Sequence, residues 1–365
     1  MRITVFLSCA LALFSVLNPF SSYRRHMMKN NGAESVSLQK KSEEISAVIE
    51  EYLPGIVCWG DSLTVGAGGD GVTYPDTLAS LIKENITDEY NVSVPEKYRV
   101  DDIPVVNMGV GGETSPTIVA RSGTVPFRVQ EFTVPADKTP VKIKIYSDLR
   151  KRVLPLIQGD GGVNPVTIGG IKGTLTSTRD SVPARTEYFF SREEVGEETV
   201  IPRGTEIVTY SSGMWKDYIN VVFIGTNGDF RNPTELIEHQ KAILARNERN
   251  GERYIVIGLY AVNSAQVNGS LLDYFAELES ALSEEYGERF INLREYLTTD
   301  ALSDAGIEPT EDDLEAISEG KVPPSLMVDD LLHLNATGYE LVGRLIYERM
   351  DSLGYFDEVK GALAE

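Results

Sequence analysis

Residues 56–66 read Ile56-Val57-Cys58-Trp59-Gly60-Asp61-Ser62-Leu63-Thr64-Val65-Gly66, and in them an apolar run leads directly into a Gly-Asp-Ser-Leu turn. A short, continuous apolar run is typical of a strand that is buried on both faces. A helix that follows the turn would place Ser62 at the carboxyl end of this strand, where open α/β sheets bind their ligands. Taken alone, the tetrapeptide is explained equally well as a glycine turn with a Ser or Asp helix cap.

The segments around this stretch alternate between apolar runs and amphipathic runs. After the first strand, strands are predicted at residues 104–108, 218–224, 254–260 and 289–293. Helices are predicted from the spacing of apolar residues at 44–53, 74–86, 234–246, 271–286, 309–318 and 336–350. This alternation predicts an α/β protein with a mostly parallel five-stranded sheet and right-handed crossovers. The polar residues 28–45 are expected to form a mobile lead-in.

Residues 125–212 interrupt the alternation. Runs of β-branched residues, such as those at 141–146 and 206–210, alternate here with Gly, Pro and Asp and lack helical spacing. Further short strands are expected in this region, at 166–168, 173–175 and 187–190. We therefore expect a small antiparallel β domain inserted between two parts of the α/β domain, residues 28–124 and 213–365.

The composition restricts the partners. The 365 residues, of which 42% are hydrophobic and 24% charged, are typical of a soluble globular protein. The 34 Lys and Arg residues against 55 Asp and Glu residues give a net charge of -21, which argues against nucleic acids and anionic membrane surfaces as partners. Only Cys9 and Cys58 are present, so we expect no disulfide framework and a buried Cys58.

The N-terminus has the features of an export signal. Arg2 precedes the apolar run from Ile3 to Leu17, which has the length of a signal-peptide core rather than of a full membrane span. We therefore expect residues 1–27 to be a signal peptide or anchor of a secreted or membrane-anchored protein whose mature domain does not insert stably into the membrane. The alternative is a cytoplasmic protein whose translation starts at Met27 or Met28, since no clean small-x-small cleavage site follows the run.

Histidine is the most restrictive residue type, because the chain has only His26, His239 and His333. His239 falls inside a predicted helix, where a solvated or packed role is expected. His333 follows the pair Asp329-Asp330 and precedes the last predicted helix. An acid at this spacing in a turn can fold back onto the imidazole Nδ1 and leave Nε2 for a serine, although an isolated Asp-x-x-His is more often a surface pair.

Two further residues can stabilise an oxyanion. Gly112 has no side chain, so its backbone N–H can approach a substrate oxygen closely, and Asn227 can offer its side-chain amide. Each also has a structural explanation, since glycine permits a turn and asparagine caps or turns well. However, Ser62, Gly112, Asn227 and His333 all lie at predicted strand-to-helix switches, which share the carboxyl edge of one sheet.

Four segments of the chain match, in order, the signature blocks of one family. They are Gly60-Asp61-Ser62-Leu63, Asn107-x-Gly109-x-x-Gly112-x-Thr114, Gly225-Thr226-Asn227 and Asp330-x-x-His333-Leu334-Asn335. Over residues 50–122 and 215–355 the chain thus resembles the SGNH (GDSL) esterase and lipase superfamily. The resemblance implies a flavodoxin-like, three-layer α/β/α fold.

The resemblance also implies a role for each matched residue. Ser62 would be the nucleophile, His333 the base and Asp330 the acid that orients the base, while Gly112, Asn227 and the backbone N–H of Ser62 would form the oxyanion hole.

The chain departs from the family in two places. Many relatives have Asp directly after the third-block Asn, whereas this chain has Gly228 and then Asp229. Compact members also lack the insertion, whose attachment points are expected beside the active-site mouth.

The implied activity is that of a serine esterase that works through an acyl-enzyme and needs no metal or cofactor. No long apolar stretch near the motifs suggests a lipid-binding lid, so the expected substrate is a small-molecule or carbohydrate ester of a short acyl group such as acetyl.

A lysophospholipase or thioesterase acting on longer chains is an alternative. Two further alternatives are a carbohydrate-binding protein with a vestigial hydrolase body, and a phosphoesterase in which Asp61 or Asp330 holds a metal. No motif predicts the oligomeric state.

Overall fold

The computed structural model describes residues 19–149, 162–178, 186–247, 249, 251–262 and 270–364. At its centre is a five-stranded sheet with the order β2-β1-β12-β13-β14, in which every neighbouring pair is parallel. These strands are β1 (Ile56–Gly60), β2 (Val105–Gly109), β12 (Ile219–Phe223), β13 (Tyr254–Ile257) and β14 (Phe290–Ile291). The prediction of an α/β protein with a five-stranded parallel sheet is confirmed.

The register of the sheet brings three strand ends to one level. Gly60 at the end of β1 is paired with Gly109 at the end of β2 and with Phe223 at the end of β12. Every residue of β1 and β12 is buried, which explains why both strands are continuous apolar runs in the sequence. The loops that follow these three strands therefore leave the sheet side by side at its carboxyl edge.

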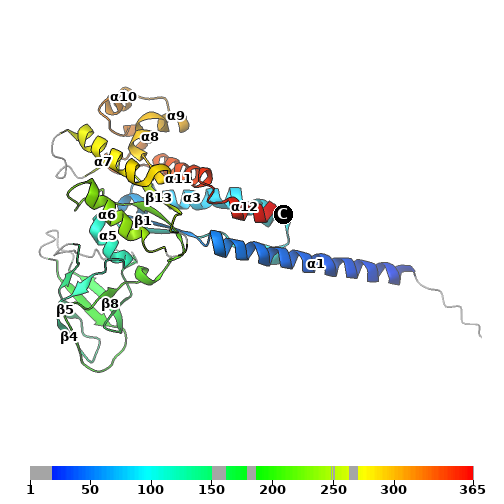
Figure 1. The fold of residues 1–365 in the computed structure, drawn as a ribbon, viewed down its shortest axis with the longest axis horizontal. Helices are drawn as coiled ribbons and strands as arrows, with labels where there is room; N and C mark the ends of the chain where they lie inside the picture. Colours follow the sequence, from blue (N-terminus) through cyan, green and yellow to red (C-terminus); the bar gives the residue numbers. More distant parts are fainter. Residues whose placement is uncertain are drawn as a thin grey trace, which may run out of the picture.

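Helices cover both faces of this sheet (Figure 1). On one side α3 (Tyr74–Ile82) contacts α11 (Ala336–Ser352), and on the other α6 (Pro233–Leu244) contacts both α5 (Ser115–Ser122) and α7 (Leu271–Tyr286). Further α-helices are α2 (Ser62–Val65), α4 (Asp88–Ser93), α8 (Leu293–Thr299), α9 (Ala301–Asp304), α10 (Glu311–Ser318) and α12 (Asp357–Ala364). The helix predicted at 271–286 coincides with α7, and the one predicted at 74–86 continues from α3 into a π-helix, Lys83–Thr87.

The N-terminal helix α1 (Pro19–Tyr52) corrects the prediction of a mobile lead-in at residues 28–45. Its carboxyl half packs on the body: Ile45 is buried with Tyr90 and Val100, and the helix contacts α12. Most of its other side chains from Ser35 onward face solvent, which is why the segment is polar although it is helical. Figure 1 shows the helix extending well beyond the rest of the molecule. Residues 1–18 of the expected export signal lie outside the described residues.

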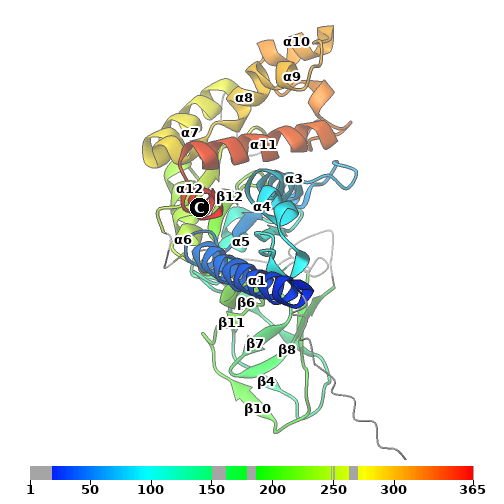
Figure 2. The same ribbon diagram turned by 90° about the vertical axis from the view of Figure 1, so that its right-hand side faces the viewer.

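The strands between Gly123 and Tyr210 form a separate β region (Figure 2). Its largest sheet has five strands in the order β11-β7-β8-β9-β5, and two further sheets pair β10 with β4 and β3 with β6, all antiparallel. The strands are β3 (Arg128–Val129), β4 (Phe132–Val134), β5 (Val141–Ile143), β6 (Ile145–Tyr146), β7 (Val166–Ile168), β8 (Ile171–Ser177), β9 (Tyr188–Arg192), β10 (Thr199–Ile201) and β11 (Ile207–Val208). The single run expected at 141–146 is divided at Lys144, because β5 pairs with β9 and β6 with β3.

The β region has a hydrophobic core of its own. Phe127, Val166, Leu175 and Phe190 are fully buried in one cluster, to which α5 contributes Ala120. The main sheet is packed in a second, larger cluster around residues such as Trp59. Within the described part of the chain, no helix combines the length and the apolar character needed to cross a membrane.

Candidate active site

Ser62 lies where the first strand turns into a helix. Strand β1 ends at Gly60, and Ser62 is the first residue of the one-turn helix α2. The carboxylate of Asp61 accepts a hydrogen bond from the Leu63 N–H at 3.0 Å, so Asp61 caps this helix. At the other end Gly66 has a φ of 84° and donates its N–H to the Ser62 carbonyl at 3.1 Å. The position of Ser62 at the carboxyl edge of the sheet agrees with the sequence prediction.

Strand β2 fixes the position of α2. The Asn107 side chain donates to the Thr64 carbonyl at 2.8 Å and accepts from the Gly109 N–H at 2.9 Å. Gly109 touches the α2 backbone so closely that an added Cβ would overlap the Val65 nitrogen and lie 2.7 Å from the Thr64 carbonyl carbon. Glycine at 109 is therefore required by packing and not by its backbone angles.

Replacing Gly109 with alanine is expected to lower the free energy of unfolding by about 1 to 3 kcal/mol, because the new methyl group must push main-chain atoms apart. The shift of α2 should also reduce any activity that depends on Ser62. Gly361→Ala is the matched control, since a Cβ there meets nothing within 4 Å in a helix; it should be neutral or stabilise by up to about 1 kcal/mol. Urea unfolding of the two variants tests this, and equal stabilities would contradict it.

His333 is presented by a tightly hydrogen-bonded loop ahead of α11. The Val328 N–H donates to the His333 carbonyl at 3.0 Å, and the Tyr260 hydroxyl donates to the Leu332 carbonyl at 3.0 Å. Leu331 has a φ of 52°, which is unusual for a branched side chain and marks local strain. Gly68 packs against the same loop, and an added Cβ there would lie 3.1 Å from the Cβ of His333.

Three side chains predicted from the sequence are joined in one series of hydrogen bonds. The Ser62 Oγ lies 2.8 Å from Nε2 of His333, and Nδ1 of His333 lies 2.6 Å from Oδ2 of Asp330. The other oxygen, Oδ1 of Asp330, accepts the N–H groups of Leu332 and His333, each at 2.9 Å. Of the two carboxylates that precede His333, the structure thus pairs Asp330 with the imidazole.

The hydrogen bonds keep the Asp330 carboxylate charged. Its partial burial raises the pKa, but the hydrogen bonds from the His333 and Leu332 N–H groups and from the imidazole outweigh this effect and lower the pKa to about 2. An ionised carboxylate on Nδ1 favours the tautomer in which Nδ1 carries the proton. In that tautomer Nε2 is free to accept the Ser62 proton.

The two predicted oxyanion donors lie on neighbouring loops at the same edge. The Val110 N–H after β2 donates to the Gly60 carbonyl at 3.1 Å, and Gly112 follows with a φ of 80°. Asn227, in the loop after β12, donates its amide to the Glu113 carbonyl at 3.1 Å. The structure therefore ties the Gly112 and Asn227 loops to each other, beside the strand that leads to Ser62.

The loop at Gly228-Asp229, where the sequence differs from many members of the superfamily that it resembles, is held in place by hydrogen bonds. Gly228 and Asp229 have φ values of 78° and 68°, a left-handed conformation that glycine adopts easily. The backbone N–H and the hydroxyl of Ser115 both donate to the Gly228 carbonyl at 3.3 Å. The same hydroxyl lies 2.9 Å from Nδ1 of His239. His239 is buried, so of the two roles expected for it, solvated or packed, the packed one is found.

Sequence reasoning missed several supporting residues. Tyr260 and Ser115 contact residues 72 and 113 positions away in the chain, and neither has a local signal in the sequence. Glu113 and Arg121 form a buried ion pair beside Gly112. Their spacing of eight residues gives no recognisable pattern.

Asp61 is a buried acid next to the candidate nucleophile. Its side chain is inaccessible to solvent, and its Oδ2 has no hydrogen-bond partner among the described residues. Burial raises the pKa of Asp61 to about 7, although the hydrogen bond from the Leu63 N–H acts in the opposite direction. The carboxyl group therefore titrates near neutral pH.

Replacing Asp61 with asparagine is expected to change the pH dependence of stability. An unfolded chain loses this proton near pH 3.8 but the folded one keeps it to about pH 7, so the wild type loses stability as the pH rises between these values. The asparagine variant does not lose stability in this way. The difference between its free energy of unfolding and that of the wild type should therefore change in favour of the variant as the pH rises from 3.8 to about 7, and stay constant at higher pH. Urea unfolding between pH 4 and pH 8, with the exposed Asp101→Asn as control, measures this. Parallel stability curves for the wild type and Asp61→Asn would contradict it.

An apolar cavity of about 250 Å³ lies against the loop that carries His333. Its walls include Tyr260, Phe275 of α7, Met327, Leu331 and Leu332. Ser62 and His333 do not line it. The cavity is therefore adjacent to the candidate site and separate from the hydrogen-bonded series.

No three His, Cys, Asp or Glu side chains come together as a potential metal site in the described part of the chain. Comparison of the chain with models of protein families, with curated proteins and with solved structures yields no match.

Proposed function

We propose that this protein is a serine esterase of the SGNH (GDSL) type, which hydrolyses carboxylic esters through an acyl-enzyme. The observation that carries the proposal is the series Asp330–His333–Ser62, with heavy-atom distances of 2.6 and 2.8 Å. These distances are those of a nucleophile, a base and an orienting acid in hydrogen-bond contact. The strand order β2-β1-β12-β13-β14, which is 2-1-3-4-5 in chain order, supports a flavodoxin-like, three-layer α/β/α fold.

In the proposed reaction His333 Nε2 takes the Ser62 proton while Oγ attacks the ester carbonyl. The C=O π electrons move to the carbonyl oxygen, which the N–H groups of Gly112 and Ser62 and the Asn227 amide stabilise. The ester C–O bond then breaks, and His333 gives its proton to the departing alcohol. Water, deprotonated by His333, attacks the acyl-enzyme, and the acid leaves as Ser62 regains its proton. Asp330 stays ionised and stabilises the imidazolium in both steps.

The substrate we favour is a small-molecule or carbohydrate ester of a short acyl group such as acetyl. One observation supports the second candidate, an esterase or thioesterase for longer acyl chains. The apolar cavity of about 250 Å³ lies on the loop of His333, where the chain of an acyl group carried on Ser62 Oγ would find a hydrophobic surface. A further candidate is a catalytically weak carbohydrate-binding protein, in which residues 125–212 bind the sugar.

A series of p-nitrophenyl esters from acetate to palmitate tests the proposal. Hydrolysis by the wild type that disappears in Ser62→Ala supports an esterase. A maximum of kcat/KM at acetate points to a deacetylase, and a maximum at longer chains points to use of the cavity. In the second case Phe275→Trp, which fills the cavity, should move the maximum to shorter chains. A folded wild type that hydrolyses none of these esters would contradict the proposal.

A further inference from the structure

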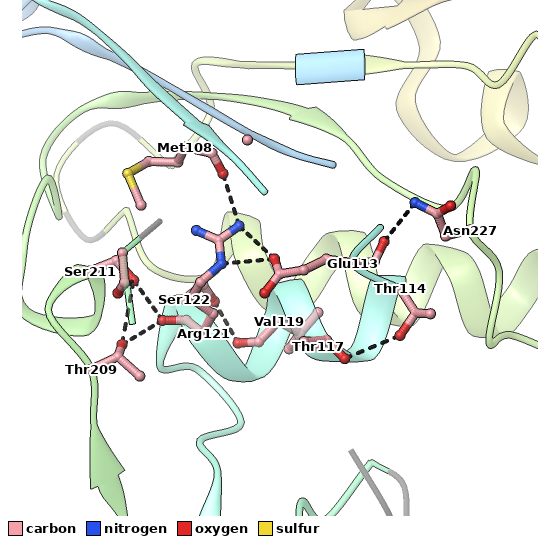
Figure 3. A network of polar contacts seen from close by, with 12 residues as sticks. Met108, Glu113, Thr114, Thr117, Val119, Arg121, Ser122, Thr209, Ser211 and Asn227 are labelled. Atoms are coloured by element: carbon pink, nitrogen blue, oxygen red, sulfur yellow. Dashed lines mark hydrogen bonds and ion pairs between the residues drawn. The ribbon is translucent and has the colours of Figure 1, made fainter. Parts of the chain in front are cut away.

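A buried ion pair joins the two ends of the segment that follows β2 (Figure 3). Glu113 comes directly after Gly112, and Arg121 lies in the last turn of α5; both side chains are 0% exposed. Nε and Nη2 of Arg121 each lie 2.8 Å from Oε2 of Glu113, and Nη2 also donates to the Met108 carbonyl at 2.8 Å. One guanidinium group therefore connects the end of β2, the loop after it and the end of α5.

This pair contacts the candidate oxyanion donors through its acidic member. Gly112 is the chain neighbour of Glu113, and Asn227 donates its amide to the Glu113 carbonyl at 3.1 Å. A rotation or shift of Glu113 would move the Gly112 N–H and the Asn227 amide together. The Glu113 side chain itself is turned away from Asn227 toward Arg121 (Figure 3).

The β region is attached to the same arginine. The hydroxyls of Thr209 and Ser211, just beyond β11, donate to the Arg121 carbonyl at 2.7 and 2.8 Å. The Ser211 N–H donates to the Gly162 carbonyl at 3.0 Å, so Ser211 connects two segments of the β region to α5. The segment that leads out of the β region is thus hydrogen-bonded to the helix that carries the ion pair.

Stability alone does not explain this arrangement. Burying two charges is costly, and an apolar pair of similar volume is often as stable or more stable. Here Oε1 of Glu113 and Nη1 of Arg121 have no hydrogen-bond partner among the described residues, which adds to the cost. The ion pair makes directional hydrogen bonds that connect the Met108 carbonyl to Glu113, the residue after Gly112. An apolar pair would not make these hydrogen bonds.

We propose that Glu113 and Arg121 are positioning residues, which hold the Gly112 and Asn227 loops in the geometry that receives the oxyanion. Thr209 and Ser211, which follow β11, stabilise the position of Arg121 by donating hydrogen bonds to its carbonyl group. Neither charged side chain touches the substrate. The inference rests on the proposed esterase function and adds to it a mechanical role for the insertion.

The double variant Glu113→Met/Arg121→Met separates positioning from stability. An apolar pair should keep the urea midpoint at or above that of the wild type. We expect kcat for p-nitrophenyl acetate to fall by about 10- to 100-fold, as for a displaced oxyanion donor, with KM changed by less than about threefold. Hydrogen exchange at the amides of residues 109–115 should become faster. Arg121→Lys, which keeps the charge but cannot contact Glu113 and the Met108 carbonyl in the same way, should give an intermediate kcat.

The double variant Thr209→Val/Ser211→Ala tests the contribution of the β region. It leaves the ion pair in place and removes the two hydroxyls, so kcat should fall by about three- to tenfold with KM maintained. The matched control is Thr174→Val/Thr176→Val, which removes two exposed hydroxyls from β8 of the same region and should leave kcat unchanged.

Each outcome of these measurements decides for or against the inference. Retention of kcat and of the exchange rates at residues 109–115 in the folded methionine variant would overturn it. If the methionine variant does not fold, the kcat values of Arg121→Lys and Thr209→Val/Ser211→Ala test the inference instead. A wild-type kcat in both of these variants would also overturn the inference. A wild type without Ser62-dependent turnover ends the esterase proposal and this inference together, whereas an active wild type with insensitive variants ends this inference alone.

Discussion

Replacing Ser62 with alanine is expected to lower kcat for ester hydrolysis by about 10⁴- to 10⁶-fold, to the level that binding and oxyanion stabilisation alone provide. The hydroxyl that lies 2.8 Å from Nε2 of His333 is removed, so no acyl-enzyme can form. The substitution deletes one oxygen from a partly exposed side chain, and the cap of α2 is made by Asp61 and not by Ser62. Stability should therefore change by less than about 1 kcal/mol.

The measurement is the initial rate with p-nitrophenyl acetate, with the urea midpoint determined on the same preparations. Ser352→Ala is the control, because Ser352 is an exposed serine at the end of α11 and should leave kcat unchanged. A folded Ser62→Ala variant that retains more than about one per cent of wild-type kcat would show that another group performs the reaction.

Replacing Asp330 with asparagine is expected to lower kcat by about 10⁴-fold although the residue does not touch the substrate. The side-chain oxygen of asparagine can still accept the N–H groups of Leu332 and His333, as Oδ1 of Asp330 does at 2.9 Å. Its amide nitrogen then takes the place of Oδ2 and donates to Nδ1 of His333. The imidazole proton must move to Nε2, where it prevents the base from accepting the Ser62 proton.

Asp329→Asn is a close control for this variant. Asp329 is the exposed carboxylate directly before Asp330, and kcat should stay within about twofold of the wild type. Because the pKa of Asp330 is lowered to about 2, the wild type should show no loss of activity from protonation of this carboxylate above about pH 3. Equal kcat values for Asp330→Asn and Asp329→Asn would show that Asp330 does not orient the base.

The elements that contain a continuous apolar run or a regular spacing of apolar residues can be predicted from the sequence. Strands β1 and β12 are buried along their whole length and appear as continuous apolar runs. Helix α7 has one apolar face, and its predicted bounds agree with the structure. The short strand β14 has only two residues, and the predicted strand at 289–293 runs past it into α8 because Leu293 continues the apolar pattern from within a helix.

The candidate site could be predicted only in part, because its residues come from distant segments. Ser62 and His333 are 271 positions apart, and they were paired through strand-end positions and a family resemblance rather than through local spacing. The Glu113–Arg121 pair, by contrast, is defined by burial and by contacts with Met108, Thr209 and Ser211. Propensities do not predict such contacts. The helical character of residues 28–43 is not predictable either, because these residues are polar and lack the apolar spacing from which helices are predicted.

Covalent labelling of the protein with a fluorophosphonate probe, followed by mass spectrometry of the digested protein, tests directly whether Ser62 is an activated nucleophile. The probe reacts with a serine only when a neighbouring base activates it, so it reports nucleophile and base together. We predict one label per chain on the peptide that contains Ser62, and none in Ser62→Ala or His333→Ala. A folded wild type that stays unlabelled, or that carries its label on another residue, would contradict the assignment of Ser62 as the nucleophile and His333 as its base.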